Sequence, residues 1–177
     1  MMHGAKLPEY GLTMRQKYDS IELPEYGYTE VNVLACTFFG HRNCSEGVKS
    51  EIFAVLQKLI NEGVNVFYVG THGNFDFYAL SVLRKMKELH PQITYMVVLA
   101  YMPSESTNFP YDEEETVFPE GIEKAPKRFA ISYRNRWMLK KSDYVVAYVT
   151  HTYGGAASFV KKAMTAGKTV INLAENE

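Results

Sequence analysis

The chain has 177 residues and a formal net charge of −1, with 46% hydrophobic and 22% charged residues. This length and composition are typical of one globular domain with a real core. The near-zero charge argues against a generally basic nucleic-acid-binding surface, although not against a local basic patch. Aromatic residues make up 14% of the chain, which suits either an aromatic-lined pocket or a subunit interface.

The two cysteines, Cys36 and Cys44, are too few for a disulfide framework, and we expect both to be reduced thiols. No apolar run approaches the roughly 20 residues of a membrane span. The first residues also lack the basic-then-apolar pattern of a secretory signal. We therefore expect a cytoplasmic protein without membrane contact. The five histidines show no metal-ligand spacing, and we expect neither a metal nor another cofactor.

The first thirty residues differ in pattern from the rest. The segment LPEYG occurs at 7–11 and again at 23–27, and two copies are too few for a repeat array. Proline and glycine in each copy favour turns or an extended arm. We expect residues 1–30 to be an N-terminal extension, either flexible or docked on a partner, with an arm across a neighbouring subunit as the alternative.

From Val31 onward, apolar runs alternate with segments of helical spacing. The predicted strands cover 31–39, 64–70, 93–100, 144–150 and 169–174. The predicted helices cover 46–62 and 75–89, a third starts at Pro126, and a fourth runs from Gly154-Gly155 to Gly167. This alternation predicts an α/β fold for residues 31–177, with a Rossmann-like, open and mostly parallel sheet of about five strands and helices on both faces.

Residues 101–125 interrupt the alternation with four prolines or glycines and the acidic run 112–115. A connection of this length indicates a lid-like insertion, a binding loop or local disorder.

The apolar faces of the last two helices follow from their spacing. The third helix is expected to bury Phe129, Ala130, Tyr133, Trp137 and Met138, and the fourth Phe159, Val160, Ala163 and Met164. Arg134 and Arg136 are two residues apart and so point to different sides of the third helix. Arg134 lies one turn before Met138, and we expect it to point inward.

In an open parallel sheet, ligands bind beyond the carboxyl ends of the strands. This rule selects four places, at 40–43, 70–76, 100–111 and 150–157, and three of them carry glycines and polar residues with a candidate role. Gly40, His41 and Arg42 follow the first strand and form either a solvated turn or an anion-binding wall. Gly70, Thr71, Gly73 and Asp76 follow the second strand. The Asp76 carboxylate either interacts favourably with the dipole of the next helix or binds a ribose hydroxyl. Thr150, His151, Gly154 and Gly155 follow the fourth, in an order typical of a phosphate cradle.

Taken together, the motifs FxGHR (38–42), GxxGxxD (70–76), RN…M…SD (134–143) and GGA (154–156) resemble the SLOG superfamily. This group unites the LOG phosphoribohydrolases, the DNA-processing protein DprA and many uncharacterised bacterial Rossmann-like proteins. The resemblance is greatest to the uncharacterised branch with a "TGHR" strand end, and it covers roughly residues 31–174.

The resemblance implies a nucleotide-binding pocket formed by Gly40, His41, Arg42, Gly70, Gly73, Asn135, Gly154 and Gly155, and commonly a homo-oligomer. It also implies Asp76 and Arg134 as candidate catalytic residues. The chain departs from LOG enzymes, however, because HTYGGAASFVKK lacks the glutamate of their PGGxGTxxE motif.

Three functions therefore remain. The first is binding of a nucleotide or nucleotide-derived ligand, as a sensor or regulator. The second is hydrolysis or transfer at an N-glycosidic bond, with Asp76 acting on the ribose and Arg134 stabilising charge. The third is binding of single-stranded DNA as in DprA, against which the absence of a basic stripe weighs.

Overall fold

The computed structural model of the chain describes residues 33–101, 111 and 115–176. The predicted N-terminal extension and the centre of the predicted 101–125 insertion lie outside the described residues.

The described residues form a six-stranded sheet in the order β4-β3-β2-β1-β5-β6, and every strand pairing is parallel. Its strands are β1 (Leu34–Gly40), β2 (Val64–Val69), β3 (Thr94–Val98), β4 (Thr116–Val117), β5 (Tyr144–Tyr148) and β6 (Thr169–Asn172). The predicted Rossmann-like α/β fold is confirmed, and all five predicted strands are present. β4 adds a sixth strand, and its two residues are too few to show a period in the sequence.

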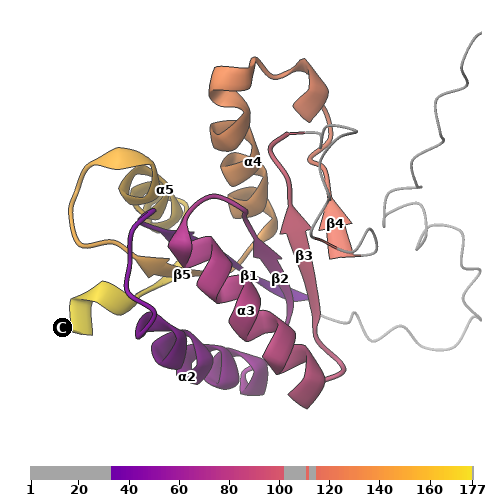
Figure 1. Cartoon of the computed structure of the whole chain (residues 1–177), viewed down its shortest axis with the longest axis vertical. Coiled ribbons are helices and arrows are strands. Elements are labelled where there is room, and N and C mark those ends of the chain that lie inside the picture. The colour runs from indigo at the N-terminus through magenta and orange to yellow at the C-terminus, as the bar shows by residue number, and fades with distance from the viewer. Residues whose placement is uncertain (1–32, 102–110, 112–114, 177) are drawn as a thin grey trace, which may run out of the picture. The chain divides into compact units, whose positions relative to one another are not determined.

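Four α-helices connect these strands: α2 (Val48–Asn61), α3 (Asn74–Leu89), α4 (Lys127–Lys141) and α5 (Gly154–Thr165). Two 3₁₀-helices, η2 (Ile122–Lys124) and η3 (Leu173–Asn176), follow β4 and β6. Helices α2 and α3 pack together on one face of the sheet, and α4 and α5 cover the other (Figure 1). No helix among the described residues is long and apolar enough to cross a membrane.

Neighbouring residues of β1 show how the sheet separates two cores. Phe38 packs with the apolar residues of α2 and α3, whereas Phe39 packs with those of α4 and α5. Successive side chains of a strand point to opposite faces, so a strand covered on both sides is apolar at every position. This is why Leu34–Phe39 reads as an apolar run interrupted only by Thr37 rather than as an alternating pattern.

Two residues predicted to face the core are exposed instead. On α4, Ala130, Arg134 and Met138 form the buried stripe, and Phe129 at the first turn is 51% exposed. One residue of offset rotates a side chain by about 100° on a helix, which takes Phe129 off that stripe. Met164, in the last turn of α5, is 55% exposed and lines an open pocket. The predicted inward orientation of Arg134 is confirmed.

The order of strands identifies where the chain changes direction within the sheet. From β1 the chain adds β2, β3 and β4 on one side, and then returns to add β5 and β6 on the other. The reversal therefore lies between β1 and β5. The crevice beyond the carboxyl ends of these two strands is where doubly wound sheets bind ligands.

Candidate functional site

A pocket of about 220 Å³ lies at this reversal point, and we call it the strand-end pocket. Four segments that are far apart in the sequence line it. The end of β1 and the turn after it contribute Phe38–Arg42, and the loop before α3 and its first turn contribute His72 and Asp76. The remaining lining residues come from α4 (Ile131, Arg134, Asn135) and from the start of α5 (Gly155, Ala156).

Arg134 is the centre of a polar network beneath this pocket. Its guanidinium is buried and lies 3.7 Å from the Asp76 carboxylate, measured from Nη2 to Oδ2. Nε and Nη2 both donate to Oδ1 of Asn135, at 3.0 and 2.8 Å. Nη1 lies 3.2 Å from Nδ1 of His72. The guanidinium is therefore held by three side chains before any ligand is present.

The contact with Arg134 determines the tautomer of His72. A guanidinium can only donate hydrogen bonds, so Nδ1 of His72 accepts and carries no proton. Burial lowers the pKa of His72, and the positive charges of Arg134 and Arg42 lower it further. His72 is thus a neutral imidazole whose remaining proton is on Nε2.

Asp76 is a buried carboxylate at the first turn of α3. Its Oδ2 accepts the backbone N–H of His72 at 2.9 Å, which closes the loop between β2 and α3. Burial raises the pKa of Asp76 above its ordinary value, while Arg134 and the His72 N–H act in the opposite direction. Asp76 thus has a structural role, in its contacts with Arg134 and the His72 N–H, and its carboxylate also lines the strand-end pocket.

Three of the predicted glycines make room for neighbouring groups of the protein. A Cβ on Gly40 would collide with the ring of Phe75, and one on Gly70 would lie 2.7 Å from Nη1 of Arg134. Gly73 has a φ of +105°, and a Cβ there would lie 2.8 Å from Cα of Arg42. That approach allows the N–H of Asn74 to donate to the carbonyl of Arg42 at 2.8 Å, which joins the turn after β1 to the start of α3.

Gly154 and Gly155 are different, because a Cβ on either would meet no atom within 4 Å. They begin α5, whose first backbone N–H groups have no partner within the helix. The open backbone here is accessible to a ligand from the strand-end pocket, which Gly155 and Ala156 line.

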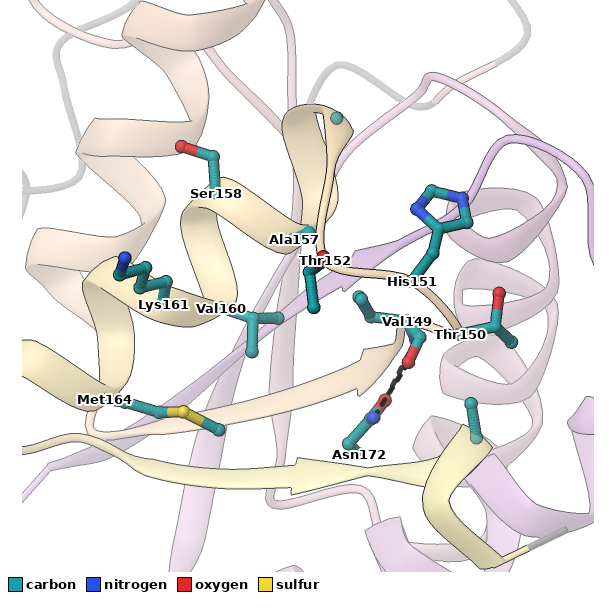
Figure 2. A pocket seen from close by; sticks show the side chains of 12 residues that line it. Val149, Thr150, His151, Thr152, Ala157, Ser158, Val160, Lys161, Met164 and Asn172 are labelled. Carbon is teal, nitrogen blue, oxygen red and sulfur yellow. Dashed lines mark hydrogen bonds between the residues drawn. The ribbon is translucent and has the colours of Figure 1, made fainter.

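A second and larger hollow of about 670 Å³, which we call the outer pocket, lies between α5 and the ends of β5 and β6 (Figure 2). Val160 and Met164 of α5 line it, together with Thr150–Thr152 and Lys161. Figure 2 also shows the side chain of Asn172 bonded to Val149, whose backbone N–H and C=O it pairs with at 2.9 and 3.0 Å. This pairing extends the contact between β5 and β6 by one residue and supports the loop that precedes α5.

Three stacked rings connect the walls of the two pockets. His41, which lines the strand-end pocket, stacks on His151 of the outer pocket with 3.8 Å between ring centroids. His151 in turn stacks on Tyr153, also at 3.8 Å. Nε2 of His41 accepts the backbone N–H of Thr150 at 2.9 Å, so this nitrogen is unprotonated. Burial and the neighbouring His151 lower the pKa of His41.

Two hydrogen-bond donors of the strand-end pocket are not engaged by the described part of the chain. Arg42 is exposed, and its guanidinium has no carboxylate partner among the described residues. Asn135 uses its Oδ1 for Arg134, and its amide N–H groups have no protein acceptor there. With two arginines and the single carboxylate of Asp76, the described lining has an excess of positive charge.

The structure thus brings together Gly40, His41, Arg42, Asp76, Arg134, Asn135 and Gly155 in one pocket. Thr150, His151 and Gly154 line the outer pocket instead, while Gly70, Thr71 and Gly73 line neither. The sequence pattern did not single out His72 as a site residue. His72 lies between two glycines after a strand, and this position is the sequence feature that could have indicated it. Its partner Arg134, however, lies on a helix that is distant in the sequence.

No protein-family model matches the chain, and no curated protein matches it. Among solved structures, the chain is similar to DNA processing protein A (DprA) from Streptococcus pneumoniae, with a TM-score of 0.57 and 18% sequence identity. The match covers 79% of this chain and 50% of that one, so the chain spans about half the length of this neighbour. The likeness shows a DprA-like Rossmann fold.

Proposed function

We propose that the protein binds a nucleotide or nucleotide-derived ligand in the strand-end pocket, as a sensor or regulator. The observation that carries this proposal is the excess positive charge of the pocket beside the open first turn of α5. Backbone N–H groups at the start of a helix favour a phosphate, and a nearby unpaired guanidinium strengthens that preference.

The network around Arg134 supports binding of an anion. Because Asp76, His72 and Asn135 already orient the guanidinium, little side-chain freedom is lost when a ligand arrives. Arg42 is free of such contacts within the described residues and provides the outer cation. In this proposal the phosphate lies between Arg42 and the N–H groups of Gly155 and Ala156, which line the same pocket.

The nucleotide character of the ligand has two supports. The pocket lies where the strand order reverses, the usual nucleotide position in this class of sheet. In addition, the four motifs that resemble the SLOG superfamily include Gly40–Arg42, Asp76, Arg134–Asn135 and Gly155, all of which line this pocket.

Isothermal titration with nucleoside monophosphates tests the proposal. We expect Arg42→Gln to weaken binding about ten-fold or more, because charge-assisted hydrogen bonds contribute roughly 1.5–3 kcal/mol. Arg136→Gln is the matched control, since Arg136 is exposed on α4 and lines neither pocket. Equal affinities of the two variants would reject the proposed phosphate position.

A glycine substitution tests the same position without a change of charge. Gly155→Ala adds a methyl group that meets no protein atom, so the fold should tolerate it while a bound phosphate should not. Gly47→Ala, before α2, is the control, because a Cβ there lies 3.6 Å from Ser45. Unchanged binding by the Gly155→Ala protein would place the ligand elsewhere.

Cleavage of an N-glycosidic bond is the second candidate function, and the position of Asp76 in the pocket lining favours it. A buried carboxylate with a raised pKa beside an arginine is typical of catalytic sites. Incubation with the same nucleotides, read out as free base, separates binding from turnover. Base release that is lost in an Asp76→Asn protein that stays folded and still binds the nucleotide supports the enzyme, whereas binding without release by the wild type excludes it for those nucleotides.

A cytoplasmic homo-oligomer is part of the same proposal, and it depends on the resemblance to the SLOG superfamily. Light scattering coupled to gel filtration measures the oligomeric state directly. A titration with a single-stranded oligonucleotide tests the third function, and we expect no salt-dependent binding in the nanomolar range.

A further inference from the structure

We infer that the ring of Tyr153 is a stacking platform for the planar base of the ligand, so that the protein selects nucleoside phosphates over sugar phosphates. This inference depends on the proposed function, because it concerns the base of a ligand whose phosphate occupies the strand-end pocket. Tyr153 immediately precedes the Gly154-Gly155 start of α5 and so adjoins the proposed phosphate position.

The first observation is that the fold holds this ring from one side only. Tyr153 stacks on His151 with 3.8 Å between centroids and an interplanar angle of 11°, and His151 stacks on His41 at 22°. Both histidines are anchored to the backbone: His41 accepts the N–H of Thr150, and Nδ1 of His151 donates to the carbonyl of Tyr153 at 3.0 Å. The ring therefore has a defined orientation although it lies at the surface.

The second observation is that the fold makes no other use of the ring. Tyr153 is 71% exposed, it contributes to no buried cluster, and its hydroxyl has no hydrogen-bond partner within the described residues. An exposed aromatic ring that is backed by two imidazoles can add a further planar group to the stack. Aromatic rings in such offset stacks attract one another, and a nucleobase is a planar group of this kind.

Tyr101, a second exposed aromatic residue near the site, is engaged differently. Tyr101 is 42% exposed, and its ring meets His72 edge-on with 5.8 Å between centroids. Its hydroxyl donates to the carbonyl of Lys127 at 3.1 Å, which ties the chain after β3 to the start of α4. Tyr101 is therefore a structural contact, and Tyr153 is the ring that is available to a ligand.

The ligand class follows from the chemistry of stacking. Every nucleobase has a π-face, so a tyrosine platform accepts all bases and rejects ligands that have none. The protein should accordingly bind the four nucleoside monophosphates more tightly than ribose 5-phosphate or inorganic phosphate. The size of the advantage reports the contribution of the ring.

Titration calorimetry with the full chain tests this, with the four nucleoside monophosphates and ribose 5-phosphate as probes. Tyr153→Ala should weaken the nucleoside monophosphates roughly five- to 150-fold and leave ribose 5-phosphate unchanged. Tyr153→Phe should bind like the wild type, because the ring rather than the hydroxyl makes the contact. Phe77→Ala is the matched control: like Tyr153, Phe77 is an exposed ring that lines neither pocket, but it meets Tyr78 edge-on and does not belong to the stack of His41 and His151.

The outcomes separate the two proposals. If the wild type binds nucleoside monophosphates but Tyr153→Ala binds them equally well, the stacking platform is wrong and the phosphate site stands. If the wild type binds ribose 5-phosphate as tightly as the nucleotides, the base makes no contact and the inference is again overturned. If the wild type binds none of the probes, both proposals fall together.

Discussion

A Cβ on Gly70 would lie 2.7 Å from Nη1 of Arg134 and closer still to Oδ2 of Asp76, so the glycine after β2 provides the space that the buried guanidinium and its carboxylate partner fill. Gly70 follows β2 and Arg134 lies on α4, so nothing in the local sequence around either residue indicates their contact. Their contact accounts for a glycine that the sequence pattern assigned to ligand binding.

The first prediction concerns this contact. Gly70→Ala should lower the free energy of unfolding by about 1–3 kcal/mol, because the added methyl group overpacks a site next to a buried ion pair. Gly47→Ala, where the nearest atom is 3.6 Å away, should be close to neutral. Urea denaturation measures both variants. Equal stability of the two variants would show that the Arg134 network moves aside at little cost.

The second prediction concerns the pair of Asp76 and Arg134. Removing either partner leaves a buried charge without its counter-charge, at a cost of about 3–5 kcal/mol. Asp76→Asn and Arg134→Met should therefore each be strongly destabilising, while the double variant should cost clearly less than their sum. Urea denaturation of all four proteins completes the cycle. Additivity within about 0.5 kcal/mol would mean that the two side chains do not interact.

The third prediction is a dependence of stability on pH. The pKa of His72 is lowered from 6.5 in the folded chain, so the unfolded chain takes up protons first as the pH falls. The free energy of unfolding should therefore decrease from the neutral range through 6.5, and level off below the folded pKa. Asp76, whose pKa is raised, acts in the opposite direction.

Comparison with a variant isolates the histidine. His72→Asn keeps a hydrogen-bond acceptor for Arg134 but cannot titrate, so it should lose less stability on acidification than the wild type. Urea denaturation at about pH 7.5 and about pH 5.5 provides the comparison. His41→Gln, which keeps an acceptor for the Thr150 N–H, should behave in the same way because the pKa of His41 is also lowered. Identical pH profiles for wild type and variants would contradict the lowered pKa values of His72 and His41.

The fourth prediction concerns Asn172, whose amide pairs with both backbone groups of Val149. Asn172→Asp replaces the donor by an oxygen that faces the Val149 carbonyl, and it should cost about 1–3 kcal/mol. Asn61→Asp on the exposed surface of α2 is the control. Thermal unfolding compares the two variants. A loss no larger than that of the control would show that the contact does not support the loop before α5.

The sequence was most informative about elements long enough to show a period. Helices α2 and α3 and the five longer strands lie within a few residues of their predicted ranges. A helix with one buried face repeats apolar residues about every 3.6 positions, and a strand covered on both faces is a mostly apolar run. The inward position of Arg134 also followed from spacing, since Met138 lies one turn away on the same helix. β4 has two residues and could not be recognised, and Phe129 and Met164 were misassigned because their neighbours on the adjoining elements decide their exposure.

Glycine was the residue type that the sequence interpreted least well. Gly40, Gly70 and Gly155 each follow a strand, and by pattern alone all three suit a ligand loop. In the structure, Phe75 fills the space beside Gly40, and Asp76 and Arg134 fill the space beside Gly70. Of the three glycines, only Gly155 has open space beside it. The group that occupies the space beside a glycine belongs to a residue distant in the sequence. The spacing of residues therefore cannot predict which group it is.

The amino-acid order by itself determined that this chain forms a parallel α/β sheet with polar loops at the carboxyl ends of its strands, because burial on both faces imposes a local pattern. Only the tertiary structure decided which loops meet. The reversal between β1 and β5 brings His41, Asp76, Arg134 and Gly155 together and leaves Thr150 and Gly154 on the outer pocket. Strand order is set by long-range packing of whole elements, and it is this order that turns separate motifs into one positively charged pocket.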